Sequence, residues 1–144
     1  MKFSADSDAT DETWDGTVLM VEEERTYICN EVCAAGQWMA LDLGATTACQ
    51  KVALADAGTV YRACTGVALE AGVVGGKVRV LKKGIYPSCY VASGSAKGGL
   101  LYGTTTAGTM DDTAPSDETE SIKGGIQITA ESGGLAGCYV NAPF

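Results

Sequence analysis

The stretch TGVALEAGVVGGKVRVLKKG, residues 65–84, predicts two β-strands joined by a glycine turn. Apolar residues occupy every second position on both sides of its centre, at Val67 and Leu69 and again at Val78 and Val80. This period of two is typical of half-buried antiparallel strands. The glycines between the two runs supply the positive φ angles that a tight reversal needs. We therefore expect a β-hairpin here.

A second, shorter copy of the same pattern lies near the end of the sequence. GIQITA, residues 125–130, aligns with GVALEA, residues 66–71. The pair Gly133–Gly134 separates it from a second apolar run, Cys138–Val140. A strand, a glycine turn and a second strand thus follow one another again. The sequence predicts the same kind of hairpin twice.

The composition favours many short strands over long helices. The chain of 144 residues is long enough for one domain with its own core, and 19 glycines against 3 prolines indicate many turns. Turn signals recur every ~8–12 residues, which is typical of sandwiches and small barrels. We expect an all-β fold, a small antiparallel β-barrel or sandwich built from short glycine-turn hairpins, as a single domain over residues 25–144. Further strands are predicted at 18–21, 35–41, 51–54, 60–64, 85–91 and 98–102, and a short helix is allowed only at 25–35.

Residues 1–24 differ in composition from the rest and predict an extended, acidic N-terminal arm. Its aromatic side chains are Phe3 and Trp14, too little apolar surface to order the segment by itself. An arm that anchors Trp14 in a neighbour and a disordered solubilising tail are both compatible with this composition. Residues 22–25, EEER, are predicted to form an exposed turn. The carboxylates before Gly16 are Asp6, Asp8, Asp11, Glu12 and Asp15.

The net charge and the N-terminal residues limit which binding partners and which cellular location we expect. A net charge of -8 and a pI near 4.4 argue against nucleic acid as the main partner, because phosphate binding depends on clustered Lys and Arg. No apolar stretch approaches the ~20 residues of a membrane span, and no secretory signal precedes the acidic residues. We expect a protein made in a cytoplasm, with its six cysteines as free buried thiols rather than a disulfide framework.

The sequence offers little for catalysis or metal binding. It contains no histidine, which excludes Ser-His-Asp and Cys-His catalysis and every zinc site that needs a histidine. Cys29 and Cys33 are closely spaced, but Cys49 and Cys64 would complete a zinc site only with unusual spacing. The glycines at 72–76 match no phosphate-binding motif, because predicted strands flank them on both sides. We expect no enzyme, no cofactor and no metal.

One long loop, residues 104–120, is acidic and poor in apolar residues. Its carboxylates could bind a cation, but their spacing is not that of a calcium-binding EF-hand loop. A solvated acidic loop is the simpler interpretation.

The run at residues 65–84 resembles the signature of small phage head proteins of the capsid decoration, or cement, type. In that family a GVAL strand, a glycine-bearing turn and a V-x-V…G strand recur. A weaker G-[VI]-x-[LI] copy follows near the C-terminus, matched here by Gly125–Ile128. The resemblance covers about residues 36–140. It implies a small β-barrel or sandwich, commonly trimeric, that sits outside a tailed-phage head. The six cysteines and the long acidic arm depart from the family pattern.

The resemblance implies a structural virion protein that binds the outer capsid surface and clamps neighbouring major capsid subunits. The implied partners are the major capsid protein and two further copies of the chain, with synthesis in the host cytoplasm. The arm supplies the predicted capsid contacts, which are Phe3, Asp11, Glu12, Trp14 and Asp15. Two alternatives remain. One is a receptor- or carbohydrate-binding module of a phage fibre, with the loop at 104–120 as its recognition surface, and the other is an enzyme that uses carboxylates alone.

Overall fold

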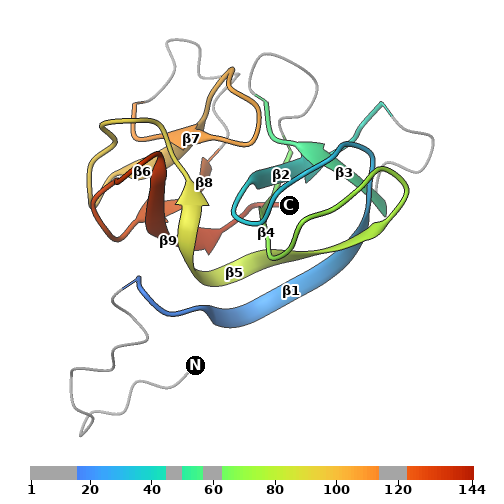
Figure 1. Cartoon of the computed structure of the whole chain (residues 1–144), viewed down its shortest axis with the longest axis horizontal. Coiled ribbons are helices and arrows are strands. Elements are labelled where there is room, and N and C mark those ends of the chain that lie inside the picture. Colours follow the sequence, from blue (N-terminus) through green and yellow to red (C-terminus); the bar gives the residue numbers. More distant parts are fainter. Residues whose placement is uncertain (1–15, 45–49, 57–62, 114–122) are drawn as a thin grey trace, which may run out of the picture.

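The computed structural model describes residues 16–44, 50–56, 63–113 and 123–144, which form one mixed β-sheet without an α-helix (Figure 1). The strands in this part of the chain are β1 (Met20–Cys29), β2 (Trp38–Leu41), β3 (Lys51–Leu54), β4 (Cys64–Ala68), β5 (Lys77–Tyr90), β6 (Leu100–Gly103), β7 (Met110–Asp111), β8 (Lys123–Gln127) and β9 (Leu135–Asn141). The predicted all-β fold is confirmed.

Five strands close into a ring in the order β1-β3-β2-β4-β5, and β5 pairs back onto β1. All pairs in the ring are antiparallel except β1 and β3, which run parallel at Ile28–Lys51 and Cys29–Val52. The closure therefore resembles a small barrel but contains one parallel pair. Closing a sheet removes unpaired strand edges, which otherwise invite association with other chains.

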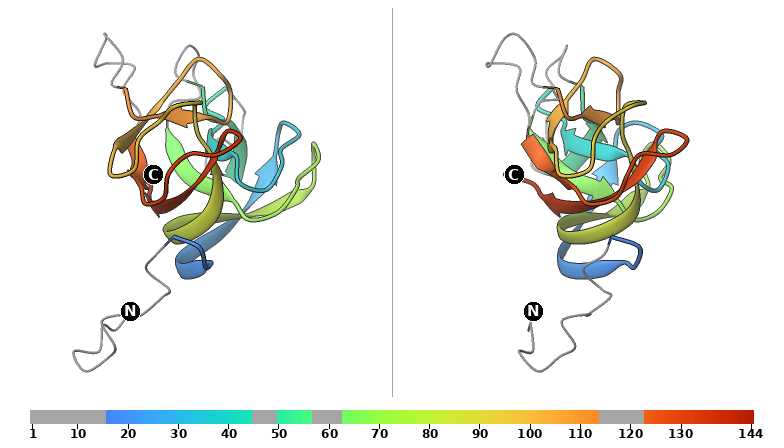
Figure 2. Two further views of the ribbon diagram at one scale, coloured as in Figure 1. Left: turned by 60° about the vertical axis from the view of Figure 1, so that its left-hand side comes forward. Right: turned by 90° about the vertical axis from the view of Figure 1, so that its left-hand side faces the viewer.

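The 14-residue strand β5 belongs to both halves of the sheet. Its first half pairs with β1 and β4, and its second half pairs with β9. From β9 the sheet continues through β8 and β6 to β7. Figure 1 shows the ring on one side and this second sheet, in orange and red, on the other. Figure 2 shows β1 and β5 side by side in two further views.

Two apolar clusters form the core, one inside the ring and one between the ring and the second sheet. The first includes Tyr27 and Met39, and the second includes Trp38 and Leu101. Because β2 and β4 contact both clusters, they are buried on both faces and carry nearly continuous apolar runs. The predicted core position of Trp38 is confirmed, since its side chain is fully buried and its indole N–H donates to the Tyr90 carbonyl at 3.0 Å.

Both predicted hairpins are present. β4 pairs with the first half of β5, and β8 pairs with β9, antiparallel in both cases. The aligned glycines of the two copies, Gly66 and Gly125, have the same structural role. A Cβ at Gly66 would overlap the Leu81 carbonyl oxygen, and a Cβ at Gly125 would overlap that of Tyr139, both well under 3.0 Å. The repeated glycine therefore marks a close approach between two strands.

The predictions for the segment before β2 are wrong in two respects. Residues 22–25, predicted as an exposed turn, lie within β1, and their side chains are exposed there as expected. The short helix allowed at 25–35 is absent, because residues 25–29 continue the same strand. Pairing with β5 along this stretch overrides the helix-forming tendency of the local sequence.

Two further boundaries differ from the predictions. The strands predicted to end at Gly84 and to begin at Ile85 are one strand, β5, and a bulge between Tyr86 and Cys89 accommodates the proline within it. The predicted loop at 104–120 contains β7, whose Met110 is fully buried in the core. The remainder of that loop from residue 114, and most of the strand predicted at 60–64, lie outside the described residues.

Candidate functional site

The candidate functional site is a row of apolar residues on the outer face of the second sheet, named the outer row below. Strand register places its members side by side on five adjacent strands. They are Met20 of β1, Ile85 of β5, Tyr139 of β9, Ile126 of β8 and Leu100 of β6. Directly opposed residues of neighbouring strands share one face of a sheet. Their neighbours along β9 and β6 are buried in the core on the other face.

Ile85 in the middle of the outer row is fully buried, whereas the end of the row at Leu100 and Ile126 is exposed. Leu100 is 48% exposed and Ile126 is 42% exposed, whereas the adjacent Gln127 is 0% exposed. The Gln127 side-chain amide donates to the carbonyls of Ser95 at 3.1 Å and of Thr129 at 2.9 Å. A strand that only had to fold would bury the isoleucine and expose the amide. The inverted order leaves Ile126 outside the core, next to the exposed Leu100.

A shallow pocket of about 190 Å³ lies at this exposed end. Leu100, Ile126 and Tyr139 form its apolar wall, and Lys123 and Asn141 place polar groups beside it. The Tyr139 hydroxyl donates to Glu22 Oε2 at 2.9 Å. Burial, followed by this hydrogen bond, raises the pKa of Tyr139, so the phenol stays neutral at ordinary pH. An apolar centre with a polar rim is typical of protein–protein interfaces.

The N-terminal arm leaves the domain on this same face. A Cβ added at Gly137 would meet the main-chain carbonyl of Gly16, so these two residues are in close contact. Gly137 lies two residues before Tyr139 on β9, and residues two apart in a strand face the same side. Gly16 therefore lies on the outer face, and residues 1–15 begin next to the outer row.

The site residues predicted from the sequence, Phe3, Asp11, Glu12, Trp14 and Asp15, lie outside the described residues, and their role stays a prediction. The outer row was missed by sequence reasoning. Its members come from five separate strands, and only the register of those strands brings them together.

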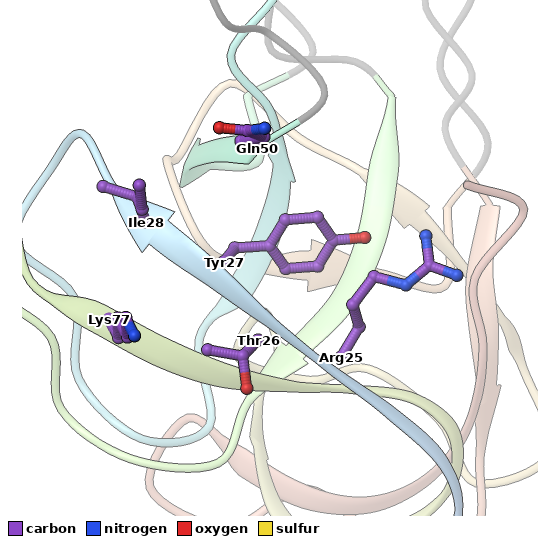
Figure 3. A pocket seen from close by; sticks show the side chains of 6 residues that line it. All are labelled: Arg25, Thr26, Tyr27, Ile28, Gln50 and Lys77. Atoms are coloured by element: carbon purple, nitrogen blue, oxygen red, sulfur yellow. The ribbon is translucent and has the colours of Figure 1, made fainter.

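A second surface feature, named the edge groove below, is a pocket of about 340 Å³ beside β1 (Figure 3). Figure 3 shows Arg25 and Tyr27 projecting to one side of β1, and Gln50 apart from them, immediately before β3. The residues that line the groove are Arg25, Thr26, Tyr27, Ile28, Gln50 and Lys77. Among the described residues, two cations and no carboxylate line this groove, on a protein whose net charge is -8.

The thiols in the described part of the chain are free and buried, as expected; they are Cys29, Cys33, Cys64, Cys89 and Cys138. Burial raises the pKa of Cys29 to about 12, and the neighbouring Cys33, whose Sγ lies 3.9 Å from that of Cys29, adds to the shift. Burial also raises the pKa of Cys64 to about 12. Protonated, buried thiols are poor nucleophiles, which makes these two cysteines unsuited to covalent catalysis at neutral pH. Cys49 lies outside the described residues.

In the described ranges, no three His, Cys, Asp or Glu side chains converge where they could hold a metal ion. No helix of that part of the chain is long and apolar enough to cross a membrane. Comparison with known proteins gives no match to this chain, either among protein-family models or among curated proteins. The function is therefore argued from the surface of the molecule and from its sequence.

Proposed function

We propose that this protein is a structural virion protein that binds the outer surface of a phage head and clamps neighbouring major capsid subunits through the outer row. The observation that carries the proposal is the exposed apolar end of this row, next to the point where the arm leaves the domain. The sequence resemblance to capsid decoration proteins supplies the partner.

The energetics of such a surface suit a protein that binds in many copies. Burying the exposed parts of Leu100 and Ile126 would contribute roughly 1–2 kcal/mol per copy. That is modest for a single contact, but a symmetric shell presents many identical sites and linked contacts reinforce one another. We expect a trimer at three-fold or quasi-three-fold positions, because oligomers on a symmetric shell share its axes.

Single substitutions at the outer row test the proposal. Ile126→Glu and Leu100→Glu place a charge in the contact and should weaken co-sedimentation with undecorated heads on the order of tenfold or more. Val73→Glu is the matched control, since Val73 is 66% exposed in the turn of the first hairpin, away from the outer row. All three variants change surface positions, so their thermal midpoints should stay close to that of the unmodified protein.

The outcome separates the proposal from its main alternative. Electron cryomicroscopy of decorated heads should place the outer row against the capsid surface at the three-fold positions. Normal decoration by both outer-row variants would contradict the proposed docking surface. Selective binding on a glycan array, without binding to heads, would instead support the receptor- or carbohydrate-binding module of a phage fibre.

A further inference from the structure

Before Ile28, one side of β1 pairs with no strand of the described ranges, although the ring closes at Ile28 and Cys29. On its other side β1 pairs with β5, whereas β3 pairs with β1 only from Ile28 onward. The N–H of Cys29 donates toward β5 and that of Asn30 donates toward β3, at 2.8 Å in both cases. Because main-chain groups alternate in direction along a strand, those of Thr26 point to the β3 side, where no described strand pairs with it. This stretch of β1 can accept one more strand.

The two cations of the edge groove, Arg25 and Lys77, are not engaged in ion pairs within the described ranges. By contrast, Arg79 on β5 is 3.5 Å from both Glu24 and Glu70. The groove therefore attracts negative charge, and its open main chain favours an extended peptide over a compact ligand.

We propose that the edge groove binds the acidic N-terminal arm, residues 1–15, of a second copy of this protein as an added β-strand. The arm carries five carboxylates and one lysine. These carboxylates complement Arg25 and Lys77, and the main chain of the arm completes the hydrogen bonds of Thr26. An extended chain of this length spans up to about 50 Å, enough to reach a neighbouring copy.

A second copy is favoured over the arm of the same chain because of where the arm begins. Gly16 is held against Gly137 of β9, and the chain then enters β1 at Met20. The groove lies at the other end of β1, near Ile28. An arm in its own groove would have to reverse directly after Gly16 and run back beside its own strand. An arm that continues outward reaches a neighbour without reversal.

Exchange of arms would link the copies without any capsid. Each copy offers one arm and one groove, so two copies can exchange arms, or several can close into a ring where the rotation allows it. In this arrangement Asp11, Glu12 and Asp15 contact the neighbouring copy instead of the capsid, which differs from the expectation from the sequence, and Phe3 and Trp14 stay available to the shell.

Sedimentation velocity of the purified full-length protein over a concentration series tests the inference. We expect reversible association that weakens between ~0.05 M and ~0.5 M salt, because exposed charge pairs are screened. Arg25→Glu and Lys77→Glu together should raise the dissociation constant on the order of tenfold. Lys97→Glu is the charge-reversal control, since Lys97 is exposed in the turn near Gly98 and lies outside the groove.

Reversing the charges of the arm in one variant and of the groove in another gives the decisive test. The arm variant Asp11→Lys, Glu12→Lys, Asp15→Lys should not associate alone but should bind the Arg25→Glu, Lys77→Glu protein when the two are mixed. A peptide of residues 1–16 should shift the amide resonances of residues 24–28 in protein that lacks residues 1–15. Monomeric full-length protein at all concentrations, or no rescue in the mixture, would overturn the inference. Neither result depends on capsid binding, so it leaves the proposed function separately testable.

Discussion

Replacing Gly66 by alanine should destabilise the protein far more than a glycine-to-alanine change in a turn. Gly66 has a φ of 136°, which alanine rarely adopts, and its added Cβ would overlap the Leu81 carbonyl oxygen. The backbone strain costs ~1–3 kcal/mol. Relieving the overlap requires β4 and β5 to separate by ~1 Å, which weakens one or two ladder hydrogen bonds at ~1 kcal/mol each. We expect a loss of about 2–5 kcal/mol in the free energy of unfolding.

Two matched variants separate the contributions. Gly75 has a φ of 83° but no heavy atom within 4 Å of its added Cβ, so Gly75→Ala should show the backbone cost alone, about 1 kcal/mol. Gly125 lacks a positive φ but its added Cβ overlaps the Tyr139 carbonyl oxygen, so Gly125→Ala should show the overlap alone, about 2 kcal/mol.

Urea unfolding followed by far-ultraviolet circular dichroism measures all three variants. For a chain of this size, each kcal/mol corresponds to roughly 2–4 °C in the midpoint of thermal unfolding. A Gly66→Ala variant that loses no more stability than Gly75→Ala would refute the close approach between β4 and β5. Unchanged stability of Gly125→Ala would likewise refute the close approach between β8 and β9 in the second hairpin.

Three further predictions concern the core and the thiols. Trp38→Phe should cost about 2–3 kcal/mol in urea unfolding, because it removes the hydrogen bond to the Tyr90 carbonyl and leaves a cavity; a cost below ~1 kcal/mol would contradict the packing. An unfolded cysteine has a pKa near 9.0, whereas burial raises the pKa of Cys29 and of Cys64 to about 12. The stability that is present below pH 9 should therefore fall as the pH rises from 9 toward 12. A urea midpoint that stays flat over that range would contradict these pKa values. Without reductant, all six thiols should react with a thiol reagent after denaturation, and the buried ones only slowly before it; mass spectrometry that finds intact bridges would overturn this.

The hairpins could be predicted from sequence because their signals are local. Alternating apolar residues and glycine turns lie within about 20 residues in each copy, and β4–β5 and β8–β9 pair as that pattern indicates. The closure of the ring could not be predicted in this way. It depends on β1 pairing with β5 and with β3, and nothing in residues 22–24 distinguishes an exposed strand from an exposed turn.

Strand β5 shows how neighbouring elements override local signals. Gly84 and Pro87 are both residues that commonly end strands, yet the chain stays extended from Lys77 to Tyr90. At Gly84 the missing side chain admits the Met20 carbonyl of β1, so the glycine serves strand contact instead of a turn. Glycine therefore forms a turn at Gly75 but permits a close approach between β5 and β1 at Gly84. Only the neighbouring strands decide which of the two occurs.

The outer row was hidden for a different reason, which also supports its role. The motif Gly125–Ile128 matches the first hairpin, but Val67 is fully buried whereas Ile126, which aligns with it, is 42% exposed. The two copies differ in what covers them. β4 lies between two apolar clusters, whereas β8 has the core on one face only, and that face takes Gln127. The fold leaves the apolar Ile126 exposed and buries the amide of Gln127 on the opposite face. The chain therefore has an apolar surface that its own core does not use. That surface is where a partner should be sought first.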